Sequence, residues 1–322
     1  MSADDIKKCG DLRRRIFTVG YSGGMAHLAS CFSCVEIIYT LFMKDIMNFD
    51  KENADAENRD RFVLSKGHGG LALYSVLELA GLVDSDALSN YLKPGCIIGG
   101  EPNFGDVKGI EASTGALGHG FPMAVGMALA QKLDMEEKLD NDEMLSQNPD
   151  KKDMVSQKPD EDVTVSWEPD ESKASLRKAG ESGARTYVLI GDGECQEGSV
   201  WETAAFAGAN NINNLIAIVD ENRLQKTKAV TEIAGEALLK DKWTSFGWNV
   251  IEADGHNIDE LCRVFKDAQA AGKPTVIIAK TIKGKGVSIM ENNPIWHFKM
   301  PNRKELKVFM EELKLPEEDF AL

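Results

Sequence analysis

Two polar residues stand just after two apolar runs that the sequence predicts as buried strands. Asp192 follows the run at 186–190 and Asn222 follows the run at 215–220, with a helix-length segment between the runs. A right-handed strand–helix–strand crossover brings the carboxyl ends of such strands together, at the edge where open α/β sheets bind ligands. Mg²⁺ prefers oxygen ligands and is usually held by one or two protein groups plus phosphate oxygens. The spacing therefore predicts a metal–phosphate site, with Asp192, Asn222 and a backbone carbonyl around Leu224 as metal ligands.

Glycines flank Asp192 on both sides. Gly191 and Gly193 carry no Cβ, so their backbone N–H groups approach phosphate oxygens closely, as phosphate-binding turns require. A Gly-Asp-Gly tripeptide alone is common in turns and is weak support for a cofactor. The chemistry that we expect is the anchoring of a diphosphate through a divalent cation.

Strands and helices alternate around this candidate site. The expected strands are 186–190, 215–220, 248–253 and 274–282. The expected helices are 36–43, 71–82, 118–133, 197–209 and 258–271. Parallel strands joined by helices of this length build a sheet that is covered on both faces. The fold class expected is α/β, a doubly wound parallel sheet with helices on both faces, in a single domain over 1–322.

An acidic segment interrupts this pattern. Three decapeptides repeat in register between 142 and 171, and each contains a Pro-Asp pair. Residues 134–173 hold fourteen acidic residues against five lysines, which is −9 of the chain's net charge of −15. A proline in every unit cannot continue a helix, and the few apolar residues bury little surface. We expect 136–183 to be a surface insertion, either a solvated excursion or a partner-docking or regulatory element.

Composition excludes several classes of protein. The negative charge argues against a nucleic-acid partner, and no apolar stretch approaches the roughly 20 residues of a membrane span. The N-terminus has no apolar signal core, so a cytoplasmic location is expected. Cys31 and Cys34 form a C-x-x-C within the apolar, helix-like run 28–42. A zinc site normally needs four ligands, so core packing is favoured for this pair.

The stretch 191–225, GDGECQEGSVWETAAFAGANNINNLIAIVDENRLQ, resembles the thiamine diphosphate signature, and the chain resembles transketolases over nearly its whole length outside the insertion. The resemblance implies the thiamin-diphosphate-binding fold, with thiamine diphosphate and Mg²⁺ (or Ca²⁺) as cofactors. It assigns Asp192, Asn222 and the Leu224 carbonyl to the metal. It also makes Gly191 and Gly193 cofactor contacts.

Two further motifs carry the resemblance. In the stretch 60–69, DRFVLSKGHG, His68 is expected to lie against the diphosphate. Residues 115–118, GALG, resemble the loop that holds the aminopyrimidine ring, which makes Gly115 and Leu117 cofactor contacts. A Gly-rich loop before a helix also has a plain structural explanation, so this loop only adds weight.

The resemblance implies four catalytic residues. His27 and His297 fall where the family has substrate-side histidines, which makes them candidates for proton transfer and for binding the donor sugar, and His297 also a cofactor contact. Glu197 and Glu202 match acidic residues that link the two active sites at the family's dimer interface. Without the resemblance, the histidines are ordinarily structural and the glutamates ordinary exposed helix charges.

The chain departs from the family pattern beside the substrate. Glu101 lies where the family usually has a histidine that contacts the donor's terminal hydroxyl, and Phe298 lies where a glycine is usual. An ionised carboxylate accepts a hydrogen bond from a hydroxyl but does not donate one. We therefore expect Glu101 to be a substrate contact that alters the donor preference.

The resemblance covers only the diphosphate half of a transketolase. In the family, the glutamate that activates the aminopyrimidine belongs to a following pyrimidine-binding domain, and this chain ends at Leu322. A second, pyrimidine-domain subunit is expected, most simply in an α2β2 heterotetramer that transfers a two-carbon ketol unit between sugar phosphates. Alternatives are another thiamine-diphosphate enzyme (deoxyxylulose-phosphate synthase-like or 2-oxoacid dehydrogenase-like) and a cofactor-binding subunit without catalysis. The stretches RFVLSKGH and STGALGHG favour transketolase, and the retained histidines argue against a non-catalytic subunit.

Overall fold

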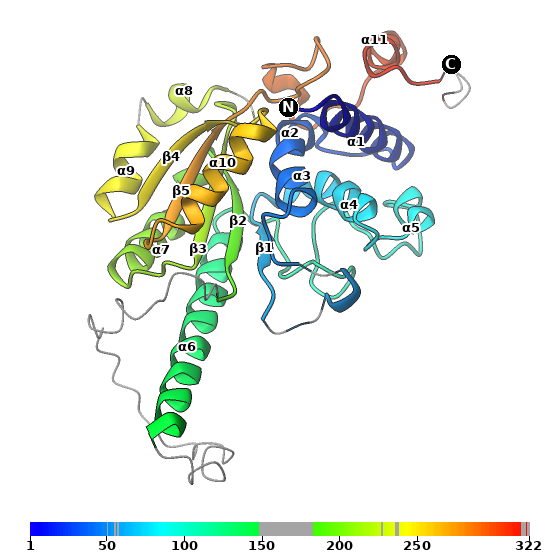
Figure 1. Ribbon diagram of the computed structural model, residues 1–322. Coiled ribbons are helices and arrows are strands. Elements are labelled where there is room, and N and C mark those ends of the chain that lie inside the picture. The colour runs from blue at the N-terminus through cyan, green and yellow to red at the C-terminus, as the bar shows by residue number, and fades with distance from the viewer. Residues whose placement is uncertain are drawn as a thin grey trace.

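The computed structural model contains one five-stranded parallel sheet (Figure 1). It describes the whole chain except residues 50, 55, 57, 148–182, 227, 236, 237, 317–319, 321 and 322. In chain order, the strands are β1 Arg61–Leu64, β2 Thr186–Gly191, β3 Leu215–Glu221, β4 Asn249–Asp254 and β5 Thr275–Lys280. In space their order is β1-β2-β3-β5-β4. The expected α/β class with a parallel sheet is confirmed.

Eleven α-helices lie in the described part of the chain. They are α1 Ala3–Ser22, α2 Leu28–Ser33, α3 Val35–Met43, α4 Gly70–Leu79, α5 Ser85–Ser89, α6 Gly120–Gln147, α7 Gly198–Ala209, α8 Val230–Ala234, α9 Leu239–Ser245, α10 Ile258–Gln269 and α11 Arg303–Leu313. Four 3-10 turns accompany them, η1 Lys51–Asn53, η2 Gly67–Gly69, η5 Glu194–Gln196 and η6 Pro294–His297. No described helix is long and apolar enough to cross a membrane.

Helices cover both faces of the sheet, because alternate side chains of each strand point to opposite faces. On β2, Tyr187 and Leu189 pack into a core shared with α1 to α4 and α10. Val188 and Ile190 pack into a second core shared with α6, α7 and α9. Burial on both faces explains why the strand reads as one continuous apolar run rather than as an alternating one.

Helix α6 extends further than its expected end at residue 133. It reaches Gln147 and so includes the first residues of the segment that we assigned to the insertion. Residues 148–182, which follow it, lie outside the described residues. Most of the decapeptide repeats lie outside the described residues.

The two ends of the expected insertion lie side by side. A Cβ added to Gly183 would come within 2.5 Å of the Met135 sulfur. Met135 and Gly183, the residues on either side of the segment 136–182, therefore lie next to each other.

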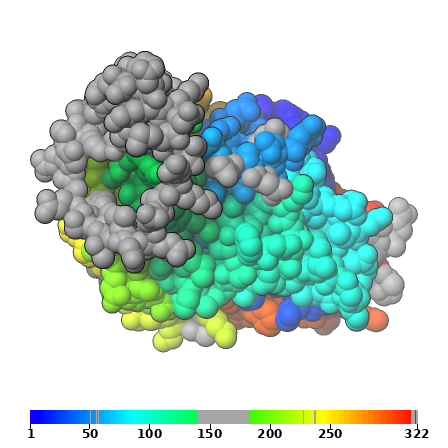
Figure 2. All heavy atoms as spheres, turned by 90° about the horizontal axis from the view of Figure 1, so that it is seen from below, coloured from blue at the N-terminus to red at the C-terminus, as the bar shows by residue number. Residues whose placement is uncertain are grey.

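Viewed from below, residues of the segment between α4 and α6 form a broad cyan to blue-green area next to α6 (Figure 2). This segment contains Glu101 and the 115–118 loop. Cys31 and Cys34 are free thiols in the first core, so their C-x-x-C packs as the sequence indicated.

Candidate functional site

The three expected metal ligands lie together at the carboxyl ends of β2 and β3. These strands are neighbours, with Gly191 paired in register with Asp220. The Asp192 carboxylate is 4% exposed and accepts the N–H groups of Gly193, at 2.8 Å, and of Arg223. The Asn222 Oδ1 accepts the Leu224 N–H at 3.1 Å. The sequence-based expectation that two distant oxygen ligands converge is thus met by the topology.

The buried charge of Asp192 is costly to the folded chain. Burial, and next the nearby Asp220 carboxylate, raise the pKa of Asp192 to about 7. A divalent cation would relieve this cost, and one carboxylate, one amide oxygen and one carbonyl are oxygen ligands of the kind that Mg²⁺ takes. The residues present therefore fit a magnesium ion.

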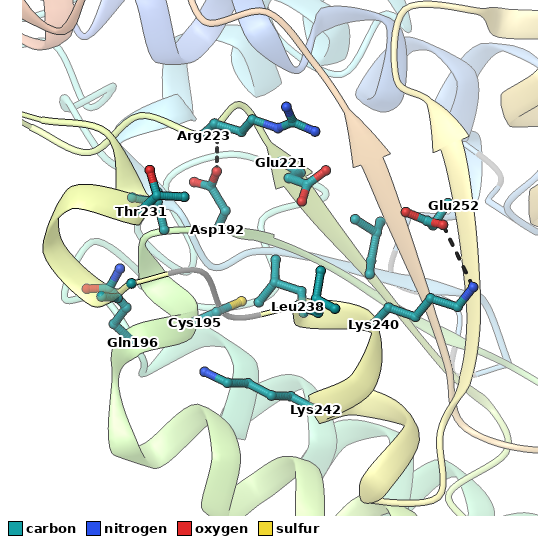
Figure 3. A pocket seen from close by; sticks show the side chains of 15 residues that line it. Asp192, Cys195, Gln196, Glu221, Arg223, Thr231, Leu238, Lys240, Lys242 and Glu252 are labelled. Atoms are coloured by element: carbon teal, nitrogen blue, oxygen red, sulfur yellow. Dashed lines mark hydrogen bonds and ion pairs between the residues drawn. The ribbon is translucent and has the colours of Figure 1, made fainter.

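Asp192 is reached from open space. Together with Glu221 and Arg223 it lines a cavity of about 270 Å³, whose other walls come largely from α8 and α9 (Figure 3). The figure shows the Asp192 side chain turned toward the Arg223 backbone, with the Lys240 and Glu252 ion pair at the far wall. The lining of this cavity does not include Asn222 or Leu224, so the cavity borders Asp192 on the side of α8 and α9 only.

Three imidazoles meet beside the metal ligands. The ring centroids of His27 and His68 are 5.4 Å apart, those of His27 and His297 5.3 Å, and those of His68 and His297 5.5 Å. They come from the N-cap of α2, from η2 and from η6. The structure thus brings together three of the chain's five histidines from distant positions.

All three imidazoles are neutral near pH 7. Burial and then the Lys283 charge lower the pKa of His27 to about 4 and that of His297 to about 3. Burial and then Lys66 hold the pKa of His68 well below its usual value. A neutral imidazole both donates and accepts a hydrogen bond, which suits a polar ligand.

Lys283 is a site residue that the sequence reasoning missed. It is 2% exposed, and its ammonium group donates to the Leu224 carbonyl at 3.2 Å and lies 2.9 Å from His297 Nδ1. A charged Lys283 makes that nitrogen the acceptor, so the proton of neutral His297 sits on Nε2. Burial and the Lys66 charge lower the pKa of Lys283 to about 8. Its position could have indicated a site residue, because Lys283 comes just after β5, and β5 lies beside β3 in the sheet.

Glu194 was missed as well. It is 1% exposed, and its carboxylate accepts the Ser65 hydroxyl, the Gly118 N–H at 2.9 Å and the Gly191 N–H at 3.2 Å. Burial raises its pKa. This one side chain ties together the loop before His68, the 115–118 loop and the Gly191 turn.

The 115–118 loop packs tightly against its surroundings. Gly115 has a φ of +139°, and a Cβ there would overlap the Glu101 carboxylate. A Cβ on Gly67 would lie 2.6 Å from the Gly115 nitrogen. Glu101 therefore lies directly against the loop that we expect to hold the aminopyrimidine, and the Tyr74 hydroxyl fixes its backbone carbonyl at 2.9 Å. Leu117 of the same loop is 38% exposed.

Glu197 and Glu202 lie at the start of α7, apart from the three histidines. Glu197 is the N-cap residue of α7 and Glu202 lies within its first turns, and both are exposed. The Glu197 side chain packs close to Gly118. Both glutamates are accessible to another chain, which the interface role requires.

Nine buried side-chain polar atoms have no hydrogen-bond partner within the described residues, and two of them belong to residues next to the site in sequence. They are the Ser30 hydroxyl on α2 and the Gln225 Nε2, which follows Leu224. Buried polar groups are normally paired, so unpartnered donors beside a site are available to a ligand. Oxygen-rich groups such as a diphosphate fit these donors together with Lys283.

Comparisons with known proteins identify the family of the chain. The profile described as transketolase, thiamine diphosphate binding domain, matches residues 20–148 and 172–321. The A subunit of the apulose-4-phosphate transketolase of Phocaeicola vulgatus is 32% identical over 94% of this chain and 90% of the relative. A 6-deoxy-6-sulfo-D-fructose transketolase subunit of a Clostridium species is 35% identical over 85% of this chain and 83% of the relative.

Solved structures share the fold. A transketolase of Pichia stipitis in complex with sedoheptulose 7-phosphate superposes with a TM-score of 0.79 at 24% identity, over 100% of this chain and 42% of that one. The Campylobacter jejuni enzyme gives 0.75 at 24% identity, over 99% and 45%. The chain therefore spans less than half the length of these enzymes but nearly the full length of the subunit relatives. The family model and the two subunit relatives lead to one assignment: the chain is a member of the transketolase family of transferases and carries its thiamine diphosphate binding domain.

Proposed function

We propose that the chain is the diphosphate-binding subunit of a two-subunit transketolase. With a pyrimidine-domain subunit, it transfers a two-carbon ketol unit from a ketose (phosphate) donor to an aldose (phosphate) acceptor. The observation that carries the proposal is the convergence of the Asp192 and Asn222 oxygens with Lys283 and three neutral imidazoles at one edge of the sheet. The subunit length of the relatives described above supports it.

The cofactors in this proposal are thiamine diphosphate and Mg²⁺ (or Ca²⁺). Asp192, Asn222 and the Leu224 carbonyl hold the metal. Gly191, Gly193, His68 and Lys283 would surround the diphosphate. The N–H groups of Gly191 and Gly193 already donate to Glu194 and Asp192, so the two glycines would contribute close approach, and His68 and Lys283 the hydrogen bonds. Gly115 and Leu117 hold the aminopyrimidine through their backbone. When bound, thiamine diphosphate supplies the carbon centre that takes up the two-carbon unit and passes it on.

His27 and His297 act on the substrate. His297 presents its Nε2 proton because Lys283 occupies Nδ1, so it donates a hydrogen bond to a sugar oxygen. His27 lies 5.3 Å from it, ring centroid to ring centroid, and is also neutral. Together the two rings bind the donor's oxygens and move a proton to or from them as the carbon–carbon bond breaks.

The partner covers the open side of the site. Large apolar side chains next to site residues in sequence are exposed, and they are Ile97 at 61%, Phe104 at 70%, Leu117 at 38%, Ile295 at 70% and Phe298 at 49%. Exposed apolar surface of this kind marks interaction sites. We propose an α2β2 heterotetramer in the cytoplasm, in which Glu197 and Glu202 lie at the interface that links two active sites.

The donor sugar depends on Glu101. Its carboxylate lies against Gly115, beside the proposed ring position, where it accepts a hydrogen bond from a donor hydroxyl. Two relatives are named for apulose 4-phosphate and for 6-deoxy-6-sulfo-D-fructose. We propose that this chain likewise prefers a donor other than the usual pentose phosphate, although it serves sugar-phosphate metabolism.

The decisive test is reconstitution with a pyrimidine-domain protein encoded by a neighbouring reading frame. The pair is expected to transfer a ketol unit in the presence of thiamine diphosphate and Mg²⁺, and the chain alone to show no turnover. An inactive pair across ketose and ketose-phosphate donors would refute the proposal.

Glu101→His tests the donor assignment in the same assay. The ratio of kcat/KM between donors is expected to change by about tenfold or more, because the substituted ring donates where the carboxylate only accepts. Asp106→Asn, which also removes a carboxylate from this segment, serves as the control. Unchanged ratios in the Glu101 variant would show that Glu101 does not contact the donor.

A further inference from the structure

A buried ion pair lies beside the site, and its only role given above is the effect of its charges on the pKa values of Asp192, His68 and Lys283. Lys66 is 1% exposed and Asp220 is fully buried, and their ammonium and carboxylate groups are in direct contact. The Lys66 ammonium also donates to the Ser30 carbonyl at 3.1 Å and to the Ser33 hydroxyl at 3.4 Å. The Asp220 carboxylate accepts the Ser33 hydroxyl at 2.7 Å and the Thr281 hydroxyl. The two charges are therefore fully paired.

The pair joins four segments, and each of them carries a site residue within three positions. Ser30 follows His27 at the start of α2, and Lys66 precedes His68. Asp220 precedes Asn222 at the end of β3, and Thr281 precedes Lys283 after β5. Segments that are far apart in sequence thus share one buried electrostatic centre.

The contribution of this ion pair to the stability of the fold differs from its effect on the positions of the four segments. Desolvating two charges roughly offsets their attraction, so a buried ion pair is weak support for stability and is often replaceable by apolar groups. It is, however, directional, because each hydrogen bond fixes one segment at one distance. A pair that adds little net stability but holds four segments in register is suited to preorganising a ligand site.

We propose that Lys66 and Asp220 are positioning residues, whose buried ion pair holds α2, η2 and the ends of β3 and β5 so that His27, His68, Asn222 and Lys283 converge. This proposal rests on the proposed function for one point, the identity of the ligand that the site binds. The convergence of the side chains itself is a property of the unliganded chain.

The central test is the double variant Lys66→Met/Asp220→Asn in the full chain. Each single variant leaves a buried charge unpaired and is expected to lower the melting temperature strongly. The double variant is expected to regain most of the wild-type melting temperature. It is nevertheless expected to need about tenfold more thiamine diphosphate with Mg²⁺ for half-maximal thermal stabilisation.

A second readout needs no cofactor. In the unliganded protein with labelled histidines, the short distances among His27, His68 and His297 give nuclear Overhauser contacts between imidazole protons. The double variant is expected to lose these contacts while its melting temperature stays near the wild-type value. A wild-type chain that shows the contacts but no response to thiamine diphosphate would count against the proposed function alone.

Two comparisons make the test specific. Arg15→Met/Glu78→Gln removes a partly buried ion pair between α1 and α4, with Nη2 2.6 Å from Oε1, and is expected to leave both readouts unchanged. Thr281→Val keeps the ion pair but removes the hydroxyl that ties β5 to Asp220, and is expected to weaken cofactor binding by a smaller factor. The Thr281→Val variant also tests the positioning role if the double variant does not fold. Retention of imidazole contacts and cofactor response in a folded double variant, or in Thr281→Val if only that variant folds, would overturn the positioning role.

Discussion

Among the single residues, Asp192 shows how much chemistry a sequence can carry when topology is regular. The crossover rule alone predicts that its partner Asn222 lies beside it. The histidines are different, because nothing in the local sequence of His27 or His297 distinguishes it from a structural histidine. Their convergence became predictable only through the resemblance to a family. Lys283 escaped even that, because a lysine after a strand is ordinarily a solvated surface residue.

Asp192→Ala tests the metal assignment. The substitution removes the only carboxylate among the proposed ligands, so thiamine diphosphate with Mg²⁺ is expected to give no rise in melting temperature. The unliganded variant is expected to be at least as stable as the wild type near pH 7, because it no longer buries a carboxylate whose pKa is raised to about 7. Thermal unfolding with and without ligand measures both effects. A wild-type response to Mg²⁺ in the variant would remove Asp192 from the metal site.

Lys283→Met tests the electrostatic coupling of the histidines. The Lys283 charge is the second cause, after burial, of the low pKa values of His27 and His297. Its removal is expected to raise the pKa of His297 from about 3 toward the ordinary value of 6.5, so that protonation begins at a higher pH. Proton and nitrogen resonances of the ring, followed against pH, measure the change. Lys285→Met is the matched control, and an equal shift in both variants would argue against a local effect of Lys283.

Among the helices and strands, the strands were predicted well where they are buried on both faces. The apolar runs that became β2 and β3 are continuous, because each packs into both cores. β1 was missed because it is only four residues long. Helix α1 was missed because its exposed face is highly charged, although its buried face meets α3, α4 and α11. Short or charged elements acquire their structure from tertiary contacts that the local pattern does not show.

Glu36 illustrates such a tertiary contact between elements. From α3, its carboxylate accepts two hydrogen bonds from Arg13 of α1, at 2.6 and 2.8 Å, and lies 2.9 Å from His256 Nδ1. Burial alone raises the pKa of Glu36, but Arg13 and His256 outweigh burial and lower it from 4.5 to about 2. A carboxyl with a depressed folded-state pKa contributes stability above pH 4.5 that is lost as the pH falls through about 2.

Glu36→Gln is therefore expected to lower the free energy of unfolding at pH 7 by roughly 3 to 5 kcal/mol, because Arg13 keeps a buried charge without its partner. The variant is also expected to lose less stability than the wild type between pH 4.5 and 2. Urea unfolding at several pH values gives both quantities. Glu311→Gln, an exposed position on α11, is expected to change neither. Parallel pH curves for the Glu36 variant and the wild type would contradict the role of this ion pair.

The molecule as a whole is built on one five-stranded parallel sheet that is covered on both faces, with the candidate site at the carboxyl ends of its strands. The sequence indicated the domain and the acidic segment from composition and period alone, without placing the segment in space. We propose that 136–183 is an insertion within a single domain that spans 1–322. The contact between Met135 and Gly183 supports this, as does the interruption of the family match between 148 and 172. This segment is either a solvated excursion or an element that docks a partner or regulator. Deleting the segment is expected to have different effects in the two cases.

Replacing 136–182 by a four-residue Gly/Ser linker separates these two interpretations. The ends to be joined already lie in contact, so the cost of closing a short loop between them is small and the melting temperature is expected to stay within a few degrees of the wild type. If the segment is only a solvated excursion, the shortened chain binds thiamine diphosphate with Mg²⁺ and turns over with its partner at the wild-type rate. If it docks a partner, the stable shortened chain needs a higher concentration of the pyrimidine-domain subunit for half-maximal activity. If the shortened chain fails to fold, 136–183 is not an insertion, because an insertion contributes no side chains that the core needs. Insertion of the same four-residue linker between α4 and α5 is the control for the effect of the linker itself.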